Sequence, residues 1–286
     1  MGWAFRAAGA LPRRMGRRVR VLQHRSAAGR KATELLTHPI RHRDMRVLAG
    51  SMRGVRINLA GSYLGFLTGD AEPEVQRALQ EFVEPGQVVY DVGANIGFFT
   101  LLLARLVGPG GRVFAFEPMP ENAVALRHNV ALNGLDNVTV VQKAVSSESG
   151  TAQLLLSPHS AFHSLDLEGA SKRDVLGPKS GEISVETITL DEFVAEDPAR
   201  VPDLIKLDVE GAEVIALEGM RRVLESAQPL LLCELHGTHD GYRDFVDSMR
   251  YEARIIDAES PRHDPVNPHT LAWPRERDVQ VVGAPV

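Results

Sequence analysis

The sequence predicts an α/β fold: a mostly parallel, seven-stranded sheet with helices on both faces and a small β insert. Two observations lead to this class. Apolar, strand-like runs alternate with helical patterns over residues 88–142 and again over 203–257. The first of these strands also runs directly into a glycine turn that opens a helix. Strands joined through helices pair in parallel through right-handed crossovers, which gives such a sheet.

The expected elements follow in chain order. Weak alternation over residues 45–59 predicts a β-hairpin, and residues 73–83 have the apolar spacing of a helix with acidic residues at its start. The first half of the core is predicted as strands 88–92, 112–116 and 137–142 with helices 97–107 and 120–132. The second half is predicted as strands 203–208, 229–235 and 251–257 with helices 212–225 and 239–249, and a last strand at 279–282. The β insert is expected as strands 151–156 and 183–189 around a polar segment at 157–182.

The charge is divided unevenly along the chain. Residues 1–56 hold fourteen Lys and Arg against two acidic residues, whereas the rest has a surplus of seventeen acidic residues. We therefore expect a basic N-terminal arm (1–45), a hairpin and helix leading into the core (46–84), and a main domain (85–286). Two interpretations of the arm stay open: a solvated, partly disordered tail, or a weak contact with an anionic partner such as a membrane surface.

The composition is that of an ordinary globular protein, with 286 residues, 44% hydrophobic and 24% charged. The single cysteine, Cys233, excludes an internal disulfide, and its apolar neighbours predict a buried thiol. The apolar stretch near the N-terminus is short and is followed by arginines, and no run of about 18 apolar residues occurs. These features predict a cytoplasmic protein, and they leave its oligomeric state open.

The glycine turn predicts a nucleoside pocket. It reads Asp91-x-Gly93-x-x-x-Gly97, and the next strand ends on Glu117. Gly93 lets the backbone bend close to a ligand, and Gly97 lets the following helix pack on the sheet. A carboxylate at the end of the second strand, such as Glu117, can accept hydrogen bonds from two ribose hydroxyls.

The spacing of this turn bears on which nucleoside is bound. Dinucleotide sites usually have G-x-G-x-x-G, because the pyrophosphate sits on the helix N-terminus. Here Asp91 precedes the first glycine, where it would repel a pyrophosphate and favour a cationic ligand such as S-adenosylmethionine (SAM). The tyrosines also form no Tyr-x-x-x-Lys pair. SAM is the predicted cofactor; an NAD-dependent dehydrogenase and a non-catalytic nucleoside-binding module are the alternatives.

Polar residues interrupt two later strands near their carboxyl ends. Lys206 lies inside an apolar strand, and Asp208 and Glu210 follow at a spacing of two, so their side chains face the same side. Glu234 and His236 have the same spacing at the end of the next strand. Because ligands bind at the carboxyl ends of such strands, both groups are candidates for an active site. The structural alternative for Lys206 is an ion pair with a carboxylate of a neighbouring strand, such as Glu234. For His236 it is a hydrogen bond to the backbone.

Five segments together resemble the FkbM-type family of SAM-dependent class I methyltransferases, over about residues 85–250. They are Asp91–Gly97, Phe116–Pro118, Ile188–Phe193, Ile205–Glu213 and Cys233–His236. The segment Lys-x-Asp-x-Glu-Gly-x-Glu, preceded by Thr-Leu-Asp, is more specific than the glycine turn. The resemblance implies a Rossmann-like methyltransferase fold and O-methylation of a hydroxyl, on a sugar, a glycolipid or a polyketide.

The resemblance also implies roles for the site residues. Asp208 is our first choice as the general base and His236 the second. Glu210 would hold the substrate or the turn, and Lys206 would steady the carboxylates or favour the developing alkoxide. On the cofactor side the expected residues are Asp91, Gly93, Asn95, Gly97, Glu117 and Ala144, the last beside adenine.

No metal site is predicted, although Asp208, Glu210, Glu234 and His236 offer oxygen and nitrogen ligands, because the single cysteine excludes a zinc cluster and the family resemblance does not demand a metal. Nucleic acid is disfavoured as a substrate, since an acidic crevice repels phosphates. The expected partner is a small-molecule or glycan acceptor with a free hydroxyl.

Overall fold

The computed structural model describes residues 42–156, 164–165, 181–260, 263–277, 279–281 and 283–286. The chain divides into two compact units, with the boundary between Ala71 and Glu72. Most of the basic arm and most of the 157–182 segment lie outside the described residues. The predicted contact of the arm with an anionic partner therefore stays a prediction.

The described part of the first unit contains the predicted hairpin. Strand β1 (Asp44–Arg46) pairs antiparallel with β2 (Arg56–Asn58). A short helix, α4 (Gly65–Thr68), follows and ends on Gly69, whose φ of 76° is in the left-handed region. This helix was not predicted, because four residues are too few to show a helical period.

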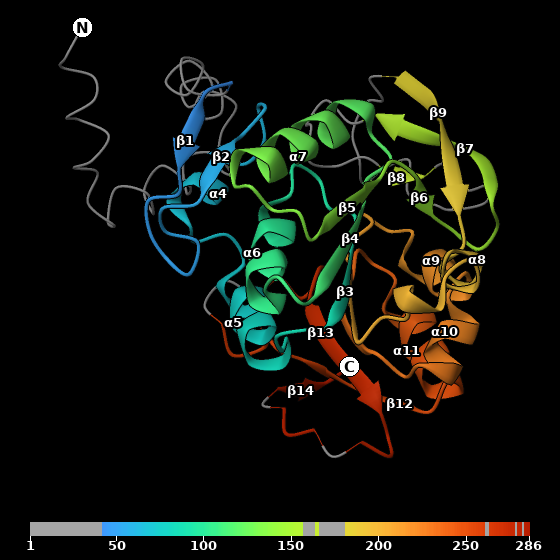
Figure 1. Cartoon of the computed structure of the whole chain (residues 1–286). Coiled ribbons are helices and arrows are strands. Elements are labelled where there is room, and N and C mark those ends of the chain that lie inside the picture. Colours follow the sequence, from blue (N-terminus) through green and yellow to red (C-terminus); the bar gives the residue numbers. More distant parts are fainter. Residues whose placement is uncertain (1–41, 157–163, 166–180, 261–262, 278, 282) are drawn as a thin grey trace, which may run out of the picture. The chain divides into compact units, whose positions relative to one another are not determined.

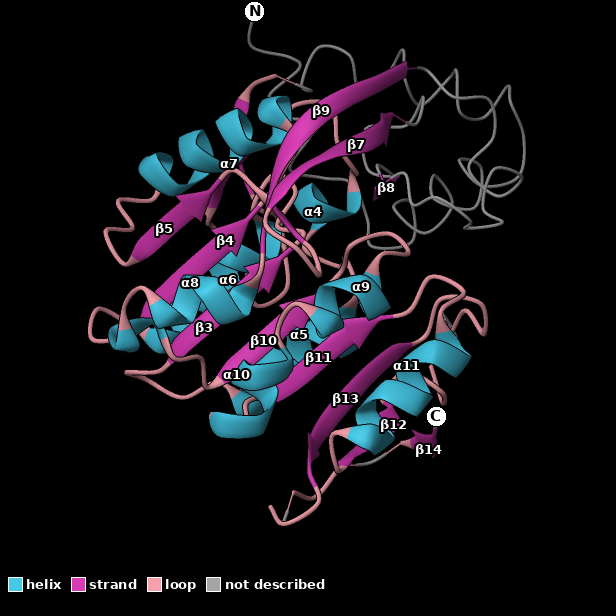
Figure 2. Ribbon diagram, turned by 90° about the vertical axis from the view of Figure 1, so that its right-hand side faces the viewer, coloured by secondary structure: helices cyan, strands magenta, loops and turns pink. Residues whose placement is uncertain are grey.

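The second unit is built on an eight-stranded sheet in the order β14-β12-β13-β11-β10-β3-β4-β5 (Figure 2). Its strands are β3 (Val88–Val92), β4 (Arg112–Phe116), β5 (Val138–Val141), β10 (Leu204–Leu207), β11 (Leu230–Glu234), β12 (Tyr251–Ile255), β13 (His269–Pro274) and β14 (Ala284–Pro285). Strands β5, β4, β3, β10 and β11 pair in parallel, and β13, β12 and β14 add antiparallel pairs. The predicted α/β class with a mostly parallel sheet is confirmed.

Two strand predictions at the C-terminal edge are wrong. Strand β13 was missed; it lies between β11 and β12, which makes eight strands rather than seven. It starts after Pro268 and ends at Pro274, and its interior is buried, so neither its flanks nor its alternation marks it as a strand. The last strand is at Ala284–Pro285, with no strand over 279–281. Just before this strand the backbone of Gly283 passes close to β12, because a Cβ on Gly283 would lie 2.3 Å from the carbonyl oxygen of Ile255.

Helices cover both faces of this sheet (Figures 1 and 2). One face carries α5 (Pro73–Phe82), α6 (Phe98–Val107) and α7 (Pro120–Leu132). The other carries α8 (Leu190–Ala195), α9 (Glu213–Glu218), α10 (Arg221–Ser226) and α11 (His239–Ser248), and a 3-10 turn at Pro198–Arg200 follows α8. None of the helices in the described ranges is long and apolar enough to cross a bilayer.

The single helix predicted over 212–225 is in fact two helices, α9 and α10. The break falls at Gly219, where a Cβ would lie 1.9 Å from the carbonyl oxygen of Ser146. The carbonyl of Gly219 accepts a hydrogen bond from Asp191 N (3.0 Å), and the Asp191 carboxylate accepts one from Val223 N (2.9 Å). Asp191 therefore stabilises the start of the second helix, which compensates for the broken helical hydrogen bonds.

The predicted β insert forms a separate four-stranded sheet in the order β6-β9-β7-β8. Its strands are β6 (Ala144–Val145), β7 (Gly150–Leu156), β8 (Ser164–Leu165) and β9 (Gly181–Ile188). The antiparallel β7–β9 pair extends from Gly150↔Thr187 to Leu156↔Gly181. Strand β6 was not predicted, because two residues carry no periodic signal.

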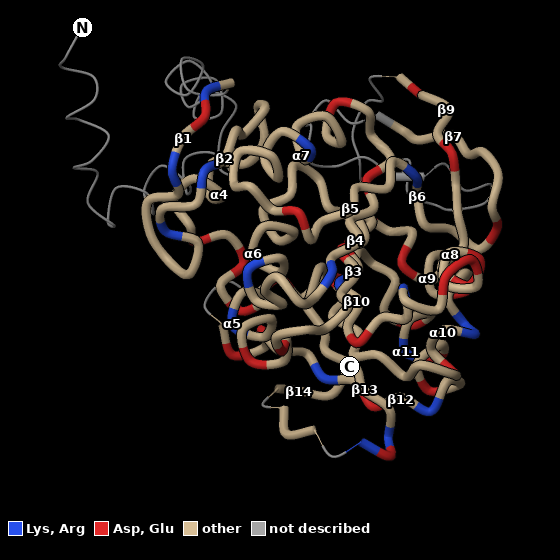
Figure 3. The backbone as a smooth tube through the Cα atoms, viewed as in Figure 1, with Lys and Arg blue, Asp and Glu red and all other residues tan. Residues whose placement is uncertain are grey.

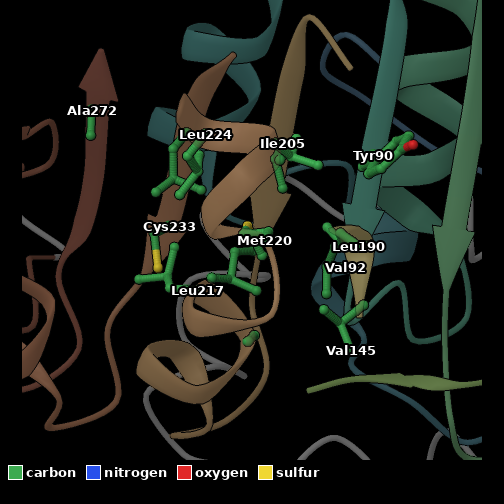
Figure 4. Close-up of a cluster of buried hydrophobic side chains, with 14 of the residues drawn as sticks. Tyr90, Val92, Val145, Leu190, Ile205, Leu217, Met220, Leu224, Cys233 and Ala272 are labelled. Atoms are coloured by element: carbon green, nitrogen blue, oxygen red, sulfur yellow. The ribbon is translucent and has the colours of Figure 1, made fainter. Parts of the chain in front are cut away.

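A buried apolar cluster joins the main sheet to the helices on one of its faces (Figure 4). At its centre the ring of Phe193 lies 5.1–5.8 Å, between centroids, from the rings of Tyr90, Phe114 and Phe116. Edge-to-face aromatic contacts of this kind stabilise a core beyond the area they bury. Cys233 belongs to the same cluster and is fully buried, as predicted, and burial raises the pKa of its thiol.

Candidate active site

The glycine turn is held between the ends of two neighbouring strands. The backbone N–H groups of Gly93 and Ala94 both donate to the carbonyl of Phe116 at 3.0 Å. On the other side, a Cβ on Gly93 would lie 1.7 Å from the carbonyl oxygen of Asp208. Gly93 has a φ of 81°, and Asn95 adopts a φ of 51° without being glycine. The turn therefore fits only a residue without a side chain at position 93.

Glu117 lies directly beside this turn and is buried, with 5% of its surface exposed. Its Oε2 accepts a hydrogen bond from Asn95 N at 2.7 Å, and its Oε1 accepts from Met119 N at 2.9 Å and from Asn122 Nδ2 at 3.5 Å. Burial raises the pKa of Glu117 to about 7, although these hydrogen bonds act in the opposite direction. The carboxylate is thus oriented by the backbone and keeps lone pairs for a ligand.

A cavity of about 620 Å³, part of it open to solvent, lies between the ends of β3, β4 and β10 and the β insert. Its lining is Val92, Gly93, Asn95, Phe116, Glu117, Pro118, Asn122, Lys143, Ala144, Val145, Leu154, Asp208, Val209 and Glu210. Six of the ten residues predicted to form the site are in this lining: Gly93, Asn95, Glu117, Ala144, Asp208 and Glu210.

Two predicted cofactor residues, Asp91 and Gly97, are not in the lining. Asp91 is fully buried, accepts a hydrogen bond from Thr100 Oγ1 at 2.5 Å, and lies 3.8 Å from Lys206 Nζ. At Gly97 a Cβ would lie 2.3 Å from Leu126 Cδ1, so this glycine allows helix α7 to pack against the turn. Both residues support the turn from behind.

Lys206 is also buried, and it forms an ion pair with a neighbouring-strand carboxylate, as the structural alternative held, but with Asp91 of β3 rather than with Glu234. Asp208 is its second partner. The Nζ of Lys206 lies 3.3 Å from Asp208 Oδ2 and 3.8 Å from Asp91 Oδ1, and 4.9 Å from the centroid of the Phe99 ring. Burial alone would lower the pKa of Lys206, but the two aspartates outweigh it and raise the pKa. For Asp208 burial is the stronger effect: it raises the pKa of this carboxyl to about 6, although the nearby Lys206 ammonium lowers it. The ammonium therefore links the glycine turn to Asp208.

The ring of His236 contacts three carboxylates, those of Glu210, Glu213 and Glu234. Its Nδ1 lies 2.9 Å from Glu213 Oε1, and its Nε2 lies 3.4 Å from Glu210 Oε2 and 3.5 Å from Glu234 Oε1. Burial opposes the charged form, but the hydrogen bonds with Glu213 and Glu234 raise the pKa of His236 to about 11. The ring of His236 thus contacts carboxylates on both of its nitrogens, and His236 is not among the residues that line the cavity.

Glu213 fixes the loop that carries these groups. Besides His236, it accepts hydrogen bonds from Gly211 N at 2.6 Å and from Thr238 Oγ1 at 2.7 Å. Burial would raise the pKa of Glu213, but these contacts lower it. For Glu210, which is more weakly paired, burial dominates and raises the pKa to about 8.

A second histidine, His269, lies next to this group and was missed in the sequence. It starts strand β13 opposite Glu234 in the antiparallel register. Its Nε2 lies 3.4 Å from Glu234 Oε2 and 3.5 Å from Glu72 Oε2, and its Nδ1 lies 3.1 Å from Asp257 Oδ2. His269 was missed because β13 follows a proline-rich segment, which hid the strand and its pairing with β11. Glu72 was missed because in the sequence it resembles an ordinary acidic residue at the start of a helix.

Charged positions of both signs are interspersed along the helices of the second unit (Figure 3). The partly buried cluster around Glu234 differs from this mixture. It contains Glu72, Asp208, Glu210, Glu213, Glu234 and Asp257 with Lys206, His236 and His269. Carboxylates therefore outnumber the permanently charged cation Lys206 by six to one in this cluster.

The fold, the glycine turn and the carboxylates at the strand ends define a SAM-dependent methyltransferase of the α/β class. The family model of the methyltransferase FkbM domain matches residues 91–255, more than half of the chain. The chain belongs to the FkbM methyltransferase family.

The chain is similar to several named proteins. The chain is 31% identical over 199 residues to the 31-O-demethyl-FK506 methyltransferase FkbM of Streptomyces tacrolimicus, covering 62% of this chain and 76% of that protein. It is 32% identical over 171 residues to the hexuronic acid methyltransferase AglP of Haloferax volcanii (59% and 64%) and 27% identical over 223 residues to the 2-O-methyltransferase NoeI of Sinorhizobium fredii (71% and 83%). The crystal structure of methyltransferase FkbM from Methylobacillus flagellatus aligns with a TM-score of 0.45 at 20% identity, covering 73% of this chain and 52% of that one.

Proposed function

We propose that this protein transfers a methyl group from SAM to a hydroxyl of a sugar, glycolipid or polyketide-type acceptor. The observation that supports this most directly is that one cavity joins two kinds of wall. Gly93, Asn95 and Glu117 form the wall at the glycine turn, and Asp208 and Glu210 form the wall at the end of β10. The first suits a nucleoside and the second a hydroxyl that must lose its proton.

The residues at the turn fit SAM as the cofactor. The side-chain oxygen of Asn95 is buried and accepts no hydrogen bond from the described residues. Such an acceptor favours a ligand with donor groups, which SAM has in its ammonium and ribose hydroxyls. Glu117 would accept from the ribose hydroxyls, and Ala144 and Leu154 supply apolar surface for adenine. Gly93 leaves the space that a side chain would fill.

When bound, SAM supplies a methyl group on a sulfonium, which the acceptor oxygen attacks with release of S-adenosylhomocysteine (SAH). The protein has to hold the acceptor in line and accept its proton. We assign the proton to Asp208, because it lines the cavity and His236 does not. Lys206, 3.3 Å from Asp208, acts as a positioning residue for this carboxylate. Glu210 lines the same wall and would bind the acceptor.

The acceptor class is inferred from the chemistry of this wall and from the relatives. FkbM is named for the 31-O position of FK506, AglP for a hexuronic acid, and NoeI for a 2-O position. Paired carboxylates such as Asp208 and Glu210 suit a polyol, whose hydroxyls donate hydrogen bonds. A phosphorylated acceptor is disfavoured by the same carboxylates.

The test is transfer of isotopically labelled methyl from SAM to a panel of free sugars, uronic acids, glycolipids and macrolides with unmethylated hydroxyls. We expect labelled O-methyl product, identified by mass spectrometry, with at least one hydroxyl-bearing acceptor. Hydride transfer with NAD in place of methyl transfer would contradict the proposal. Binding of SAH with no transfer to any member of the panel would favour a non-catalytic nucleoside-binding module.

A further inference from the structure

A group of three side chains beside the cavity is not used by the proposed reaction. Glu72 precedes α5, Glu234 ends β11 and His269 starts β13. Each offers one ligand atom, and these atoms all lie within 4.8 Å of one another. We propose that Glu72, Glu234 and His269 bind a divalent first-row transition-metal ion, Zn²⁺ or Mn²⁺.

The distances within the group fit coordination better than hydrogen bonding. His269 Nε2 lies 3.4 Å from Glu234 Oε2 and 3.5 Å from Glu72 Oε2, which is longer than ordinary hydrogen bonds to nitrogen. Around an ion with bonds of about 2.1 Å, neighbouring ligand atoms lie about 3.0–3.4 Å apart in octahedral or tetrahedral geometry. Small rotations of the two carboxylates would bring all three atoms to such an ion.

Two of the three ligand atoms lack a hydrogen bond. His269 Nε2 and Glu72 Oε2 are both buried, and neither has a hydrogen-bond partner among the described residues. Buried polar atoms without partners are rare and cost free energy of folding. A bound cation would satisfy both atoms at once and would offset part of the acidic surplus of the surrounding cluster.

The other nitrogen of His269 is already held in the way that metal-binding histidines are held. Asp257 Oδ2 lies 3.1 Å from His269 Nδ1, and Asp257 Oδ1 accepts from His269 N at 3.3 Å. A carboxylate on Nδ1 fixes the tautomer and directs Nε2 toward the ion. Asp257 is 5% exposed, so this contact is shielded from solvent.

The mixed ligand set determines the class of ion. One imidazole nitrogen and two carboxylate oxygens suit Zn²⁺ and Mn²⁺, whereas Ca²⁺ and Mg²⁺ prefer oxygen alone and Cu(I) prefers sulfur. Three protein ligands leave positions for water or for an acceptor oxygen. The second oxygen of Glu234 faces His236, so the ion would share this carboxylate with the active site.

The alternative is a protonated His269 shared by the same carboxylates, without a metal. To distinguish the metal site from this metal-free ion pair, the chelator-treated, full-length protein is titrated with ZnCl₂ and with MnCl₂. Binding is measured by calorimetry and by elemental analysis after dialysis. We expect one ion per chain and a higher melting temperature. Absence of stoichiometric binding of either ion would overturn the proposal.

Variants locate the ion. His269→Ala and Glu72→Gln should each weaken binding at least ~100-fold, and Asp257→Asn, behind the ligand, by about 10- to 100-fold. His128→Ala, an exposed histidine on α7, is the matched control and should bind normally. If Asp208→Asn abolished binding and His269→Ala did not, the ion would belong to the neighbouring group of Asp208, Glu234 and His236, and our assignment would be wrong.

SAH affinity provides an independent check on folding. Variants that lose the metal but keep SAH binding are folded, because the nucleoside wall is formed by other residues. Should Glu72→Gln or His269→Ala also lose SAH, His269→Gln supplies a milder change at the same ligand. A protein that binds SAH but neither ion would refute the metal site and leave the methyltransferase proposal intact.

Discussion

At the scale of single residues, the arrangement around Asp208 determines the expected chemistry. The carboxylate lines the cavity, and Lys206 holds it from behind at 3.3 Å. Lys206 is itself held by Asp91, which lies behind the glycine turn. If the glycine turn moved, Asp91 would move the buried Lys206 ammonium group, and Asp208 would move with it.

The variant Asp208→Asn tests the assignment of the base, because it keeps the shape of the side chain and removes its basicity. Turnover should fall at least ~100-fold while SAH affinity stays within about threefold of wild type, as measured by steady-state kinetics and calorimetry. Asp136→Asn, an exposed aspartate, is the control and should be unaffected. Near-normal turnover of Asp208→Asn would show that another group takes the proton.

Glu117 predicts a pH dependence of cofactor binding. Burial raises its pKa from 4.5 to about 7, and a carboxylate accepts from ribose hydroxyls better than a carboxylic acid does. Between pH 6 and 8 the ionised fraction rises about tenfold, and SAH affinity should rise with it. The stability of the ligand-free protein should change in the opposite direction. Between pH 4.5 and 7 the folded carboxyl keeps a proton that the unfolded chain has lost, so the free energy of unfolding falls as the pH rises.

The matching control is Glu117→Gln, which cannot titrate. Calorimetric titration with SAH at several pH values should give a flat profile for this variant, apart from the titration of the ligand itself. If the wild type and Glu117→Gln had the same pH profile, Glu117 would not be the ribose acceptor.

The residues that local patterns mark were predictable, and those that depend on distant pairing were not. Gly93, Glu117, Asp208 and Glu210 each end or follow a strand, so their neighbours in sequence are sufficient to identify them. His269 is brought to Glu234 by the antiparallel β11–β13 pair. That pairing joins residues far apart in the chain, and no local pattern predicts it.

At the scale of elements, the glycine turn is the most constrained connection in the sheet. A Cβ at position 93 would lie 1.7 Å from the Asp208 carbonyl oxygen, and φ is positive there. Gly93→Ala should therefore lower the free energy of unfolding by more than about 1 kcal/mol and weaken SAH binding. Chemical denaturation and calorimetry would measure both effects.

The control for the turn is Gly110→Ala, in a loop where a Cβ would meet no atom within 4 Å. It should change neither stability nor SAH binding appreciably. Equal effects of the two substitutions would mean that the close approach of Gly93 to Asp208 is unimportant.

Two element boundaries show why the topology predicted from the sequence is partly wrong. The pattern over 212–225 is helical, and the close contact of Gly219 with Ser146, together with the hydrogen bonds of Asp191, marks the break between α9 and α10. Strand β13 is buried from Thr270 to Pro274, so its side chains do not alternate in polarity. In both cases tertiary contacts override the local signal.

At the scale of the whole molecule, the parallel strands of the second unit bring their carboxyl ends to one cavity. Strands β3 and β4 supply the turn and Glu117, and β10 supplies Asp208 and Glu210. The sequence predicted this convergence, because open α/β sheets bind ligands at that edge. Ala144 was also expected in the site, whereas the contribution of the β insert through Leu154 could be placed only in the structure.

The most direct test of this account is calorimetric titration of the purified protein with SAM, SAH and NAD in parallel, repeated with Glu117→Ala. We predict micromolar binding of SAM and SAH, no binding of NAD, and a loss of at least ~10-fold in affinity for both adenosyl ligands in the variant. Binding of NAD alone, or unchanged SAM affinity in Glu117→Ala, would contradict the assignment of this cavity to SAM.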